Sequence, residues 1–310
     1  MNLKLKNSRF ASIKFTGFAQ LNSLVSHHVA VFLFLKGTMC TLALYFQEFE
    51  SYPLTIVANR DEFFSRPSAS PQVLADNPLV FGGKDLLAGG TWLGVNEHGL
   101  LVGIVNRRSG AEKEGVGVKG RSRGLLCLDL LKVKDPLRAI EILRREKASD
   151  YQPFNLLFAN SKEAYVAYNA GERVECVRLK KGVLVLGNDS IYSGSSGKVD
   201  FANNLFEDAR RQIAEGVMDP SFFKRLFKRG IQIWDQPSLL RLFKGVLSNH
   251  RLAGSSRDPR EAICVHTSSY GTVSSTVIFY SGNEKRFHYY HASGSPCRSE
   301  YERFFSVEVL

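Results

Sequence analysis

Residues 39–62 read MCTLALYFQEFESYPLTIVANRDE. An alternating apolar run follows Cys40, and a second run, rich in β-branched residues, ends at the tetrapeptide Asn59-Arg60-Asp61-Glu62. Alternation with a period of two and β-branched enrichment predict two strands, over 40–46 and 53–58. The segment therefore places a thiol at the start of one strand and a charged cluster at the end of the next.

Blocks of strands and blocks of helices alternate along the rest of the chain. Residues 63–90 contain three prolines and two Gly-Gly pairs, and we interpret them as a long irregular excursion. Further strands are predicted at 91–95, 100–105, 155–159, 164–168, 174–179, 183–186, 262–266, 274–280 and 286–291. Helices are predicted after Ser122 and Asp135 and at 199–214, 221–228 and 238–247. This order favours an α+β protein with antiparallel sheets and helices packed outside, as one four-layer domain or two smaller ones.

Composition limits the class of protein. With 310 residues, 44% of them hydrophobic, the chain is long enough to bury a full core. The formal net charge is +11, but five Lys and Arg residues and no acidic residue lie within 1–38. The basic residues of the helices over 205–260 have no interleaved aromatic stripe, so we expect no nucleic-acid partner.

Residues 1–38 form a basic N-terminal extension. It is interpreted in three ways: residues upstream of a true start at Met39, a removable targeting or pro-segment, or a permanent part of the protein. Its apolar run, 29–35, is far shorter than the roughly 20 residues that a membrane-spanning helix needs. We therefore expect no stable membrane span.

The cysteines indicate a reducing compartment. There are five, an odd number without a CxxC pair, which argues against a disulfide framework and against a structural zinc site. They are Cys40, Cys127, Cys176, Cys264 and Cys297. Cys264 and His266 would share a strand face, but no second ligand pair lies near them in the sequence. The sequence thus predicts a cytoplasmic protein with neither a metal ion nor a cofactor.

Cys40 is a candidate nucleophile if the chain begins at this residue. Its thiol and its α-amino group would then belong to one residue, and an α-amino group has a pKa of about 7.7–8.0. Enough of it is unprotonated at neutral pH to accept the thiol proton, so one residue acts as nucleophile and base. The alternative is an inert cysteine at the start of a strand.

Three motifs resemble the NRDE family, also called the transport and Golgi organisation protein 2 family. They are Met-Cys-Thr at 39–41, Ala-Asn-Arg-Asp-Glu at 58–62 and Gly-Gly-Thr-Trp-Leu-Gly-Val-Asn at 89–96, with weaker likeness at 187–188 and 270–276. This family is similar to the N-terminal nucleophile hydrolases, whose fold is a four-layer αββα sandwich of antiparallel sheets. The resemblance implies that 39–310 form a single domain of that fold.

A more distant resemblance, to penicillin V acylases and bile salt hydrolases, implies roles for single residues. Cys40 would be the nucleophile, and Asp61 would hold its amino group with Arg60 beside it. Asn106 and Asn188 would stabilise the oxyanion, and Asn59, Phe63 and Trp92 would lie near the substrate. Arg60 and Asp61 are adjacent, so both reach one site only if their strand ends at about Asn59. Val273 stands where the NRDE family usually has an arginine.

Two functions follow from these resemblances. The first is an amidohydrolase acting on a linear amide or a related acyl bond of a small molecule. The second is a protein that handles haem or lipid without catalysis.

Overall fold

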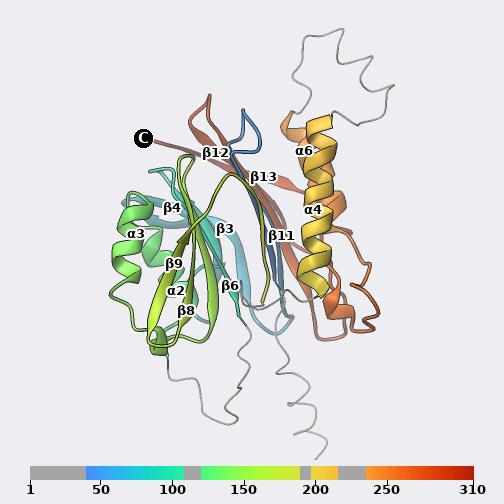
Figure 1. The fold of residues 1–310 in the computed structure, drawn as a ribbon, viewed down its shortest axis with the longest axis horizontal. Coiled ribbons are helices and arrows are strands. Elements are labelled where there is room, and N and C mark those ends of the chain that lie inside the picture. The colour runs from blue at the N-terminus through green and yellow to red at the C-terminus, as the bar shows by residue number, and fades with distance from the viewer. Residues whose placement is uncertain (1–39, 108–119, 189–196, 216–234) are drawn as a thin grey trace, which may run out of the picture. The chain divides into compact units, whose positions relative to one another are not determined.

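The computed structural model describes residues 40–107, 120–188, 197–215 and 235–310 (Figure 1). All of them lie in one compact unit, Thr38–Leu310. The extension over 1–38 and the helix predicted at 221–228 lie outside the described residues.

Two antiparallel sheets form the centre of this unit. Sheet A has the strand order β10-β1-β2-β11-β12-β13, and sheet B has the order β3-β4-β5-β6-β7-β8-β9. The strands of sheet A are β1 (Thr41–Phe46), β2 (Leu54–Phe63), β10 (Gly182–Leu186), β11 (Tyr270–Ser281), β12 (Arg286–Ala292) and β13 (Glu302–Glu308). The strands of sheet B are β3 (Ser68–Asp76), β4 (Leu79–Asp85), β5 (Leu93–Asn96), β6 (Leu101–Asn106), β7 (Phe154–Ala159), β8 (Ala164–Ala170) and β9 (Arg173–Arg178).

Helices cover the outer face of each sheet. They are α2 (Arg123–Leu130), α3 (Pro136–Leu143), α4 (Gly197–Glu215) and α6 (Gln236–Leu247), with short 3₁₀ turns η1 (Ala148–Asp150) and η2 (Pro259–Glu261). Helices α2 and α3 pack on sheet B, whereas α4 and α6 pack on sheet A (Figure 1). The predicted αββα sandwich is confirmed. Within the described ranges, no helix is both long and apolar enough to cross a membrane.

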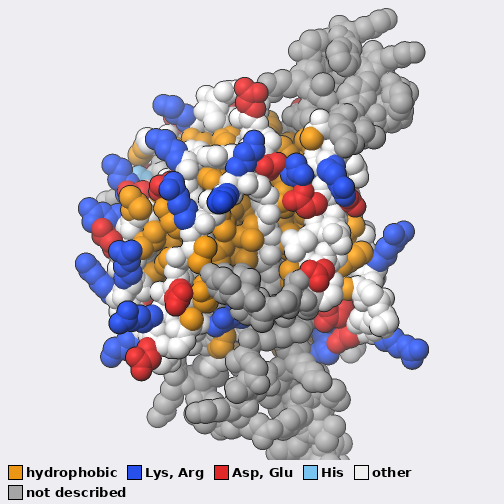
Figure 2. Space-filling model, in the orientation of Figure 1, with side chains coloured by type: hydrophobic (Ala, Val, Ile, Leu, Met, Phe, Trp, Pro, Cys, Tyr) orange, Lys and Arg blue, Asp and Glu red, His pale blue; other side chains and the backbone are white. Residues whose placement is uncertain are grey.

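Strand β1 shows why residues 39–62 are central to the fold. Leu42 and Leu44 belong to the core between the sheets, and the alternate residues Ala43 and Tyr45 belong to the core beneath α4 and α6. A strand that is buried on both faces needs apolar residues on both. Figure 2 shows apolar side chains toward the middle of this face of the molecule and Lys and Arg side chains around its rim.

The prediction of an irregular excursion over 63–90 is wrong, because β3 and β4 form a hairpin there. Pro71 is tolerated within β3 because β3 is the edge strand of sheet B, where an absent N–H need not pair, whereas Pro67 precedes β3 and Pro78 lies in the turn before β4. The glycines allow close approach: a Cβ at Gly82 would lie 2.6 Å from the carbonyl oxygen of Leu93.

Three further boundaries differ from the sequence prediction. Residues 262–266 do not form a strand, and only His266 makes an isolated bridge, to Gly271. The C-terminal strand β13 was not predicted. The predicted end of the second strand is also wrong, since β2 continues to Phe63 and pairs with β11 along that length.

Gly90 is expected to be essential for the packing of α2. A Cβ at this position would overlap the backbone of Gly124 and lie 2.5 Å from the backbone nitrogen of Leu125. We expect Gly90→Ala to lower the free energy of unfolding, measured with urea, by about 1–3 kcal/mol. Gly245 is the control, because it lies on the exposed side of helix α6 and its Cβ would meet no atom within 4 Å. Gly245→Ala should raise stability by about 0.5–1 kcal/mol; equal effects of the two variants would contradict this account.

Candidate functional site

Cys40 directly precedes β1 and lines two small cavities. The helix-side cavity, of about 10 Å³, is also lined by Asn188 and Lys198. The sheet-side cavity, of about 20 Å³, is also lined by Arg60 and Trp92. Each has room for about one water molecule. Cys40 therefore borders both cavities. The helix-side cavity lies toward α4, and the sheet-side cavity lies between the two sheets.

Burial keeps the thiol of Cys40 protonated. It raises the pKa of the thiol to about 12, and the negative charge of Asp61 adds to the effect. The Sγ atom donates a hydrogen bond to the backbone oxygen of Asp61, 3.5 Å away, and the positive charge of Arg60 acts in the opposite direction. A thiol in this state needs a base before it can act as a nucleophile.

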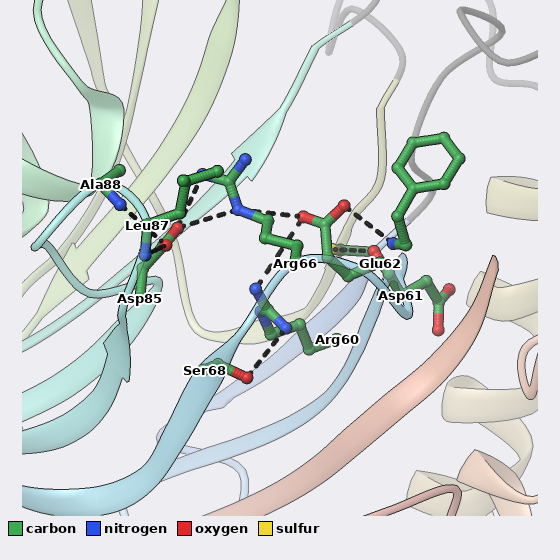
Figure 3. A network of polar contacts seen from close by, with 10 residues as sticks. Arg60, Asp61, Glu62, Arg66, Ser68, Asp85, Leu87 and Ala88 are labelled. Carbon is green, nitrogen blue, oxygen red and sulfur yellow. Dashed lines mark hydrogen bonds and ion pairs between the residues drawn. The ribbon is translucent and has the colours of Figure 1, made fainter. Parts of the chain in front are cut away.

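Arg60 and Asp61 lie on opposite faces of β2, because the strand continues beyond Asn59. Figure 3 shows the carboxylate of Asp61 pointing away from the side chains of Arg60 and Glu62. Arg60 lies toward sheet B, with its guanidinium 4.5 Å from the ring centre of Trp92 and 3.3 Å from Ser68 Oγ. Arg60 and Asp61 could reach one site only if the strand ended at about Asn59. The strand does not end there.

The carboxylate of Asp61 is fully buried and makes two strong contacts. Its Oδ1 accepts a hydrogen bond of 2.6 Å from Thr272 Oγ1, and its Oδ2 lies 3.3 Å from Lys198 Nζ. Lys198 Nζ also donates to the backbone oxygen of Arg260, at 3.2 Å. Burial raises the pKa of Asp61, although Lys198 and Thr272 favour its charged form.

A polar network surrounds Glu62 near the C-terminal end of β2 (Figure 3). Its carboxylate lies 3.9 Å from Arg60 and 3.7 Å from Arg66. Arg66 in turn forms a 2.7 Å ion pair with Asp85, whose other oxygen accepts backbone hydrogen bonds from Leu87 and Ala88. These contacts hold the pKa of Asp85 below its usual value. The network fixes the side chain of Arg60 from the surface side.

Asn59 acts as a link between elements. Its Nδ2 donates to the backbone oxygens of Leu247 and Ile263, both at 2.9 Å, and its Oδ1 accepts from Ser275 at 2.6 Å. Two donors and an acceptor of the amide are thus used within the protein. The side chain predicted to lie near a substrate joins β2 to the end of α6 and to the segment before β11.

The remaining predicted residues divide into two groups. Asn188 is buried and lines the helix-side cavity with Cys40, and Trp92 lines the sheet-side cavity. Asn106, at the end of β6 and opposite Phe154, is not among the residues that line either cavity. Phe63 is also absent from both linings, and its ring packs edge to face with Tyr270 at 5.2 Å.

The sequence analysis missed two cations beside Cys40. Arg123 interacts electrostatically with Cys40 and donates to the backbone oxygen of Pro153 at 2.9 Å. Lys198 is buried and shares the helix-side cavity with Cys40. Each cation lies in the first turn of its helix, α2 or α4, where a positive charge opposes the helix dipole. A basic residue at the start of a helix was therefore the sequence signal that could have identified Arg123 and Lys198 as site residues.

The protein is thus an αββα sandwich with a candidate nucleophile, a thiol that directly precedes a strand and borders two small cavities. The family model of Transport and Golgi organisation 2 matches residues 39–293, so the chain belongs to this family. The resemblance seen in the sequence is confirmed.

Curated relatives from three mammals carry the same family name. The Bos taurus homologue is 28% identical over 245 residues, covering 74% of this chain and 82% of the relative. The Mus musculus homologue is 27% identical over 250 residues, covering 75% and 84%. The Homo sapiens homologue is 28% identical over 244 residues, covering 74% and 82%.

Solved structures that match the chain do so at low identity. A conjugated bile acid hydrolase from Clostridium perfringens is 13% identical with a TM-score of 0.48, covering 86% of this chain and 92% of that one. A Caenorhabditis elegans N-acylethanolamine-hydrolyzing acid amidase orthologue is 16% identical with a TM-score of 0.43, covering 77% and 92%.

Proposed function

We propose that this chain is a cysteine N-terminal nucleophile amidohydrolase that cleaves a linear amide or a related acyl bond. Cys40 acts once its α-amino group is exposed. The observation that carries the proposal is the position of Cys40, directly before β1 and at the wall shared by the helix-side and sheet-side cavities. From there the thiol borders the helix-side cavity, which Asn188 and Lys198 also line, and the sheet-side cavity, whose lining is largely apolar.

The proposed base is the α-amino group of Cys40. Burial, with the charge of Asp61, raises the pKa of the thiol to about 12, so the thiol proton needs an acceptor close by. Asp61 holds the amino group and shares its carboxylate with Lys198 and Thr272. A carboxylate has about four lone-pair sites, which leaves room for this additional donor.

The reaction is an acyl transfer in two steps. The amino group takes the proton from Sγ, the Sγ–C bond forms, and Asn188, which lines the helix-side cavity with Cys40, stabilises the oxyanion. The carbon–nitrogen bond then breaks as the amino group passes its proton to the leaving amine, which leaves a thioester on Cys40. Water, deprotonated by the same amino group, attacks the thioester and releases the acid and the free thiol.

The sheet-side cavity favours an apolar acyl group. Its lining includes Trp92, Leu93 and Val105, and the guanidinium of Arg60 lies over the face of Trp92. Because the cavity has room for about one water molecule, an acyl chain would enter it only if the apolar side chains between the sheets moved apart, and Arg60 would then lie beside the chain.

The first test compares the full chain with a chain that begins at Cys40. Both are incubated with N-acyl amides of increasing acyl length, and their intact masses are measured after rapid quenching. We expect an acyl adduct on Cys40 only in the chain that begins there, because only that chain has the amino base. Cys176→Ser, a change in strand β9, is the matched control and should leave the adduct unchanged.

An adduct of equal yield on the full chain would contradict the proposed role of the amino group. Binding of haem or of acyl lipids without any adduct or turnover, unchanged in Cys40→Ala, would favour the handling function instead. The five free thiols support a reducing compartment such as the cytoplasm for either function.

A further inference from the structure

Four potential metal ligands converge at a site apart from Cys40. His250, Cys264, His266 and Cys297 each place one ligand atom so that all lie within 4.8 Å of one another. His250 follows α6, Cys264 and His266 lie between η2 and β11, and Cys297 lies between β12 and β13. The sequence analysis predicted no metal because Cys264 and His266 lacked a second pair. The fold supplies that pair from distant parts of the chain.

Three distances among these ligand atoms are close to the edges of a zinc tetrahedron. Zn–S bonds of about 2.3 Å and Zn–N bonds of about 2.0–2.1 Å give edges of about 3.8 Å between two sulfurs and about 3.6 Å between sulfur and nitrogen. Cys264 Sγ lies 3.7 Å from Cys297 Sγ and 3.6 Å from His266 Nε2. His266 Nε2 lies 3.2 Å from Cys297 Sγ. A disulfide would need the two sulfurs at about 2.0 Å.

Backbone contacts hold the ligands in place. His250 Nδ1 lies 3.1 Å from the backbone oxygen of Cys264, and a hydrogen bond donated there leaves the lone pair of the ring on Nε2. Ligating histidines usually make such a bond with their other nitrogen. The backbone N–H of Cys264 donates to the oxygen of Asn249 at 2.9 Å, which joins the two ligand segments.

We propose that His250, Cys264, His266 and Cys297 bind a structural zinc ion. Two thiolates balance the charge of Zn²⁺, and two neutral imidazoles complete a four-coordinate sphere. Four protein ligands leave no open position for a substrate or a reactive water, which is the mark of a structural rather than a catalytic site.

Zinc binding would also stabilise the segment that contacts Asp61. Thr272 Oγ1 accepts from the backbone N–H of Val265 at 2.9 Å and donates to Asp61 Oδ1 at 2.6 Å. Val265 lies between two of the ligands, Cys264 and His266. Binding of the ion would thus tie together the end of α6, the segment before β11 and the β12–β13 connection, and would fix the residues that hold Asp61.

The test uses the full chain, purified without chelators, with zinc as the probe. Native mass spectrometry and elemental analysis should find about one zinc per chain. Cobalt(II) in its place should give the visible bands of a tetrahedral site and thiolate-to-cobalt charge transfer. Cys297→Ala and His250→Ala change exposed residues and should each weaken zinc binding by at least about tenfold. Cys176→Ala, outside the cluster, should have no effect.

Three results would overturn the proposal. One is a folded wild-type chain, verified by circular dichroism, that takes up no zinc when zinc is supplied. Another is a Cys264–Cys297 disulfide in the native protein, detected by peptide mapping, which would make the pair a redox couple. The third is unchanged zinc affinity in folded Cys297→Ala, because the ion would then be held elsewhere.

Discussion

Cys40→Ala, made in the chain that begins at this position, is expected to lower amide turnover by about 10⁴-fold or more. Loss of a nucleophile that acts together with its base removes nearly all of the chemical step, and only substrate binding and oxyanion stabilisation remain. The measurement is kcat/KM for the best N-acyl amide found with the unaltered chain. Asn188→Ala, which removes one proposed oxyanion donor, should cost about 100- to 1000-fold in kcat.

Cys176→Ala provides the matched control for this prediction. Cys176 is also a free, partly buried cysteine, but it lies in β9 and lines neither cavity. Its replacement should leave kcat/KM within about twofold. Turnover that persists undiminished in Cys40→Ala would exclude this residue as the nucleophile and, with it, the proposed mechanism.

Lys198→Met is expected to lower the free energy of unfolding by about 3–5 kcal/mol. The side chains of Lys198 and Asp61 are 3% and 0% exposed, and removal of one partner leaves the other charge buried without its counter-ion. Urea unfolding at neutral pH measures the loss. The double variant Asp61→Asn with Lys198→Met removes both charges and should recover part of it.

The loss in Lys198→Met is expected to depend on pH. Burial already raises the pKa of Asp61 above its unfolded value of about 3.9, and removal of Lys198 raises it further. The folded state then binds the proton more tightly than the unfolded state, so stability falls as pH rises through the folded pKa. Relative to wild type, the variant should lose most at neutral pH and progressively less as the pH approaches about 4.

An exposed ion pair serves as the comparison. Lys244 Nζ lies 2.6 Å from Glu300 Oε1, closer than in the buried pair, yet Glu300 is 88% exposed. Glu300→Gln should change the free energy of unfolding by no more than about 1 kcal/mol. A loss below about 1 kcal/mol in Lys198→Met would show that water reaches Asp61 and that the pair is not structural.

The sequence predicted the strands whose apolar residues alternate or follow one another without interruption. This local pattern identified β5 and β6, the meander from β7 to β9, and also β10, which pairs with β1 in the other sheet. It failed for β3 and β4, where glycines and prolines suggested irregular backbone. Those glycines reflect close packing against β5 and Trp92, which only the folded sheet defines.

The candidate site was predicted only in part for a similar reason. Local motifs identified Cys40 and the strand that carries Asp61, and a resemblance supplied Asn188. Lys198 is 137 residues from Asp61 in the chain, and no local pattern indicates which buried carboxylate such a lysine will meet. Asn59 shows the same limit, because no local pattern indicated that this motif residue, which lines the sheet-side cavity, also links β2 to α6 and to the segment before β11.

The pairing of β2 with β11 has a consequence for the order of folding. Asp61 and Thr272 are 211 residues apart, so the centre of sheet A joins the first and last thirds of the protein. Contacts of such long range form slowly, since a large loop must close before they contribute. During synthesis β1 and β2 leave the ribosome long before β11 exists. Two apolar strands therefore stay without their central partner until translation is nearly complete, which is the period when a chaperone would protect them.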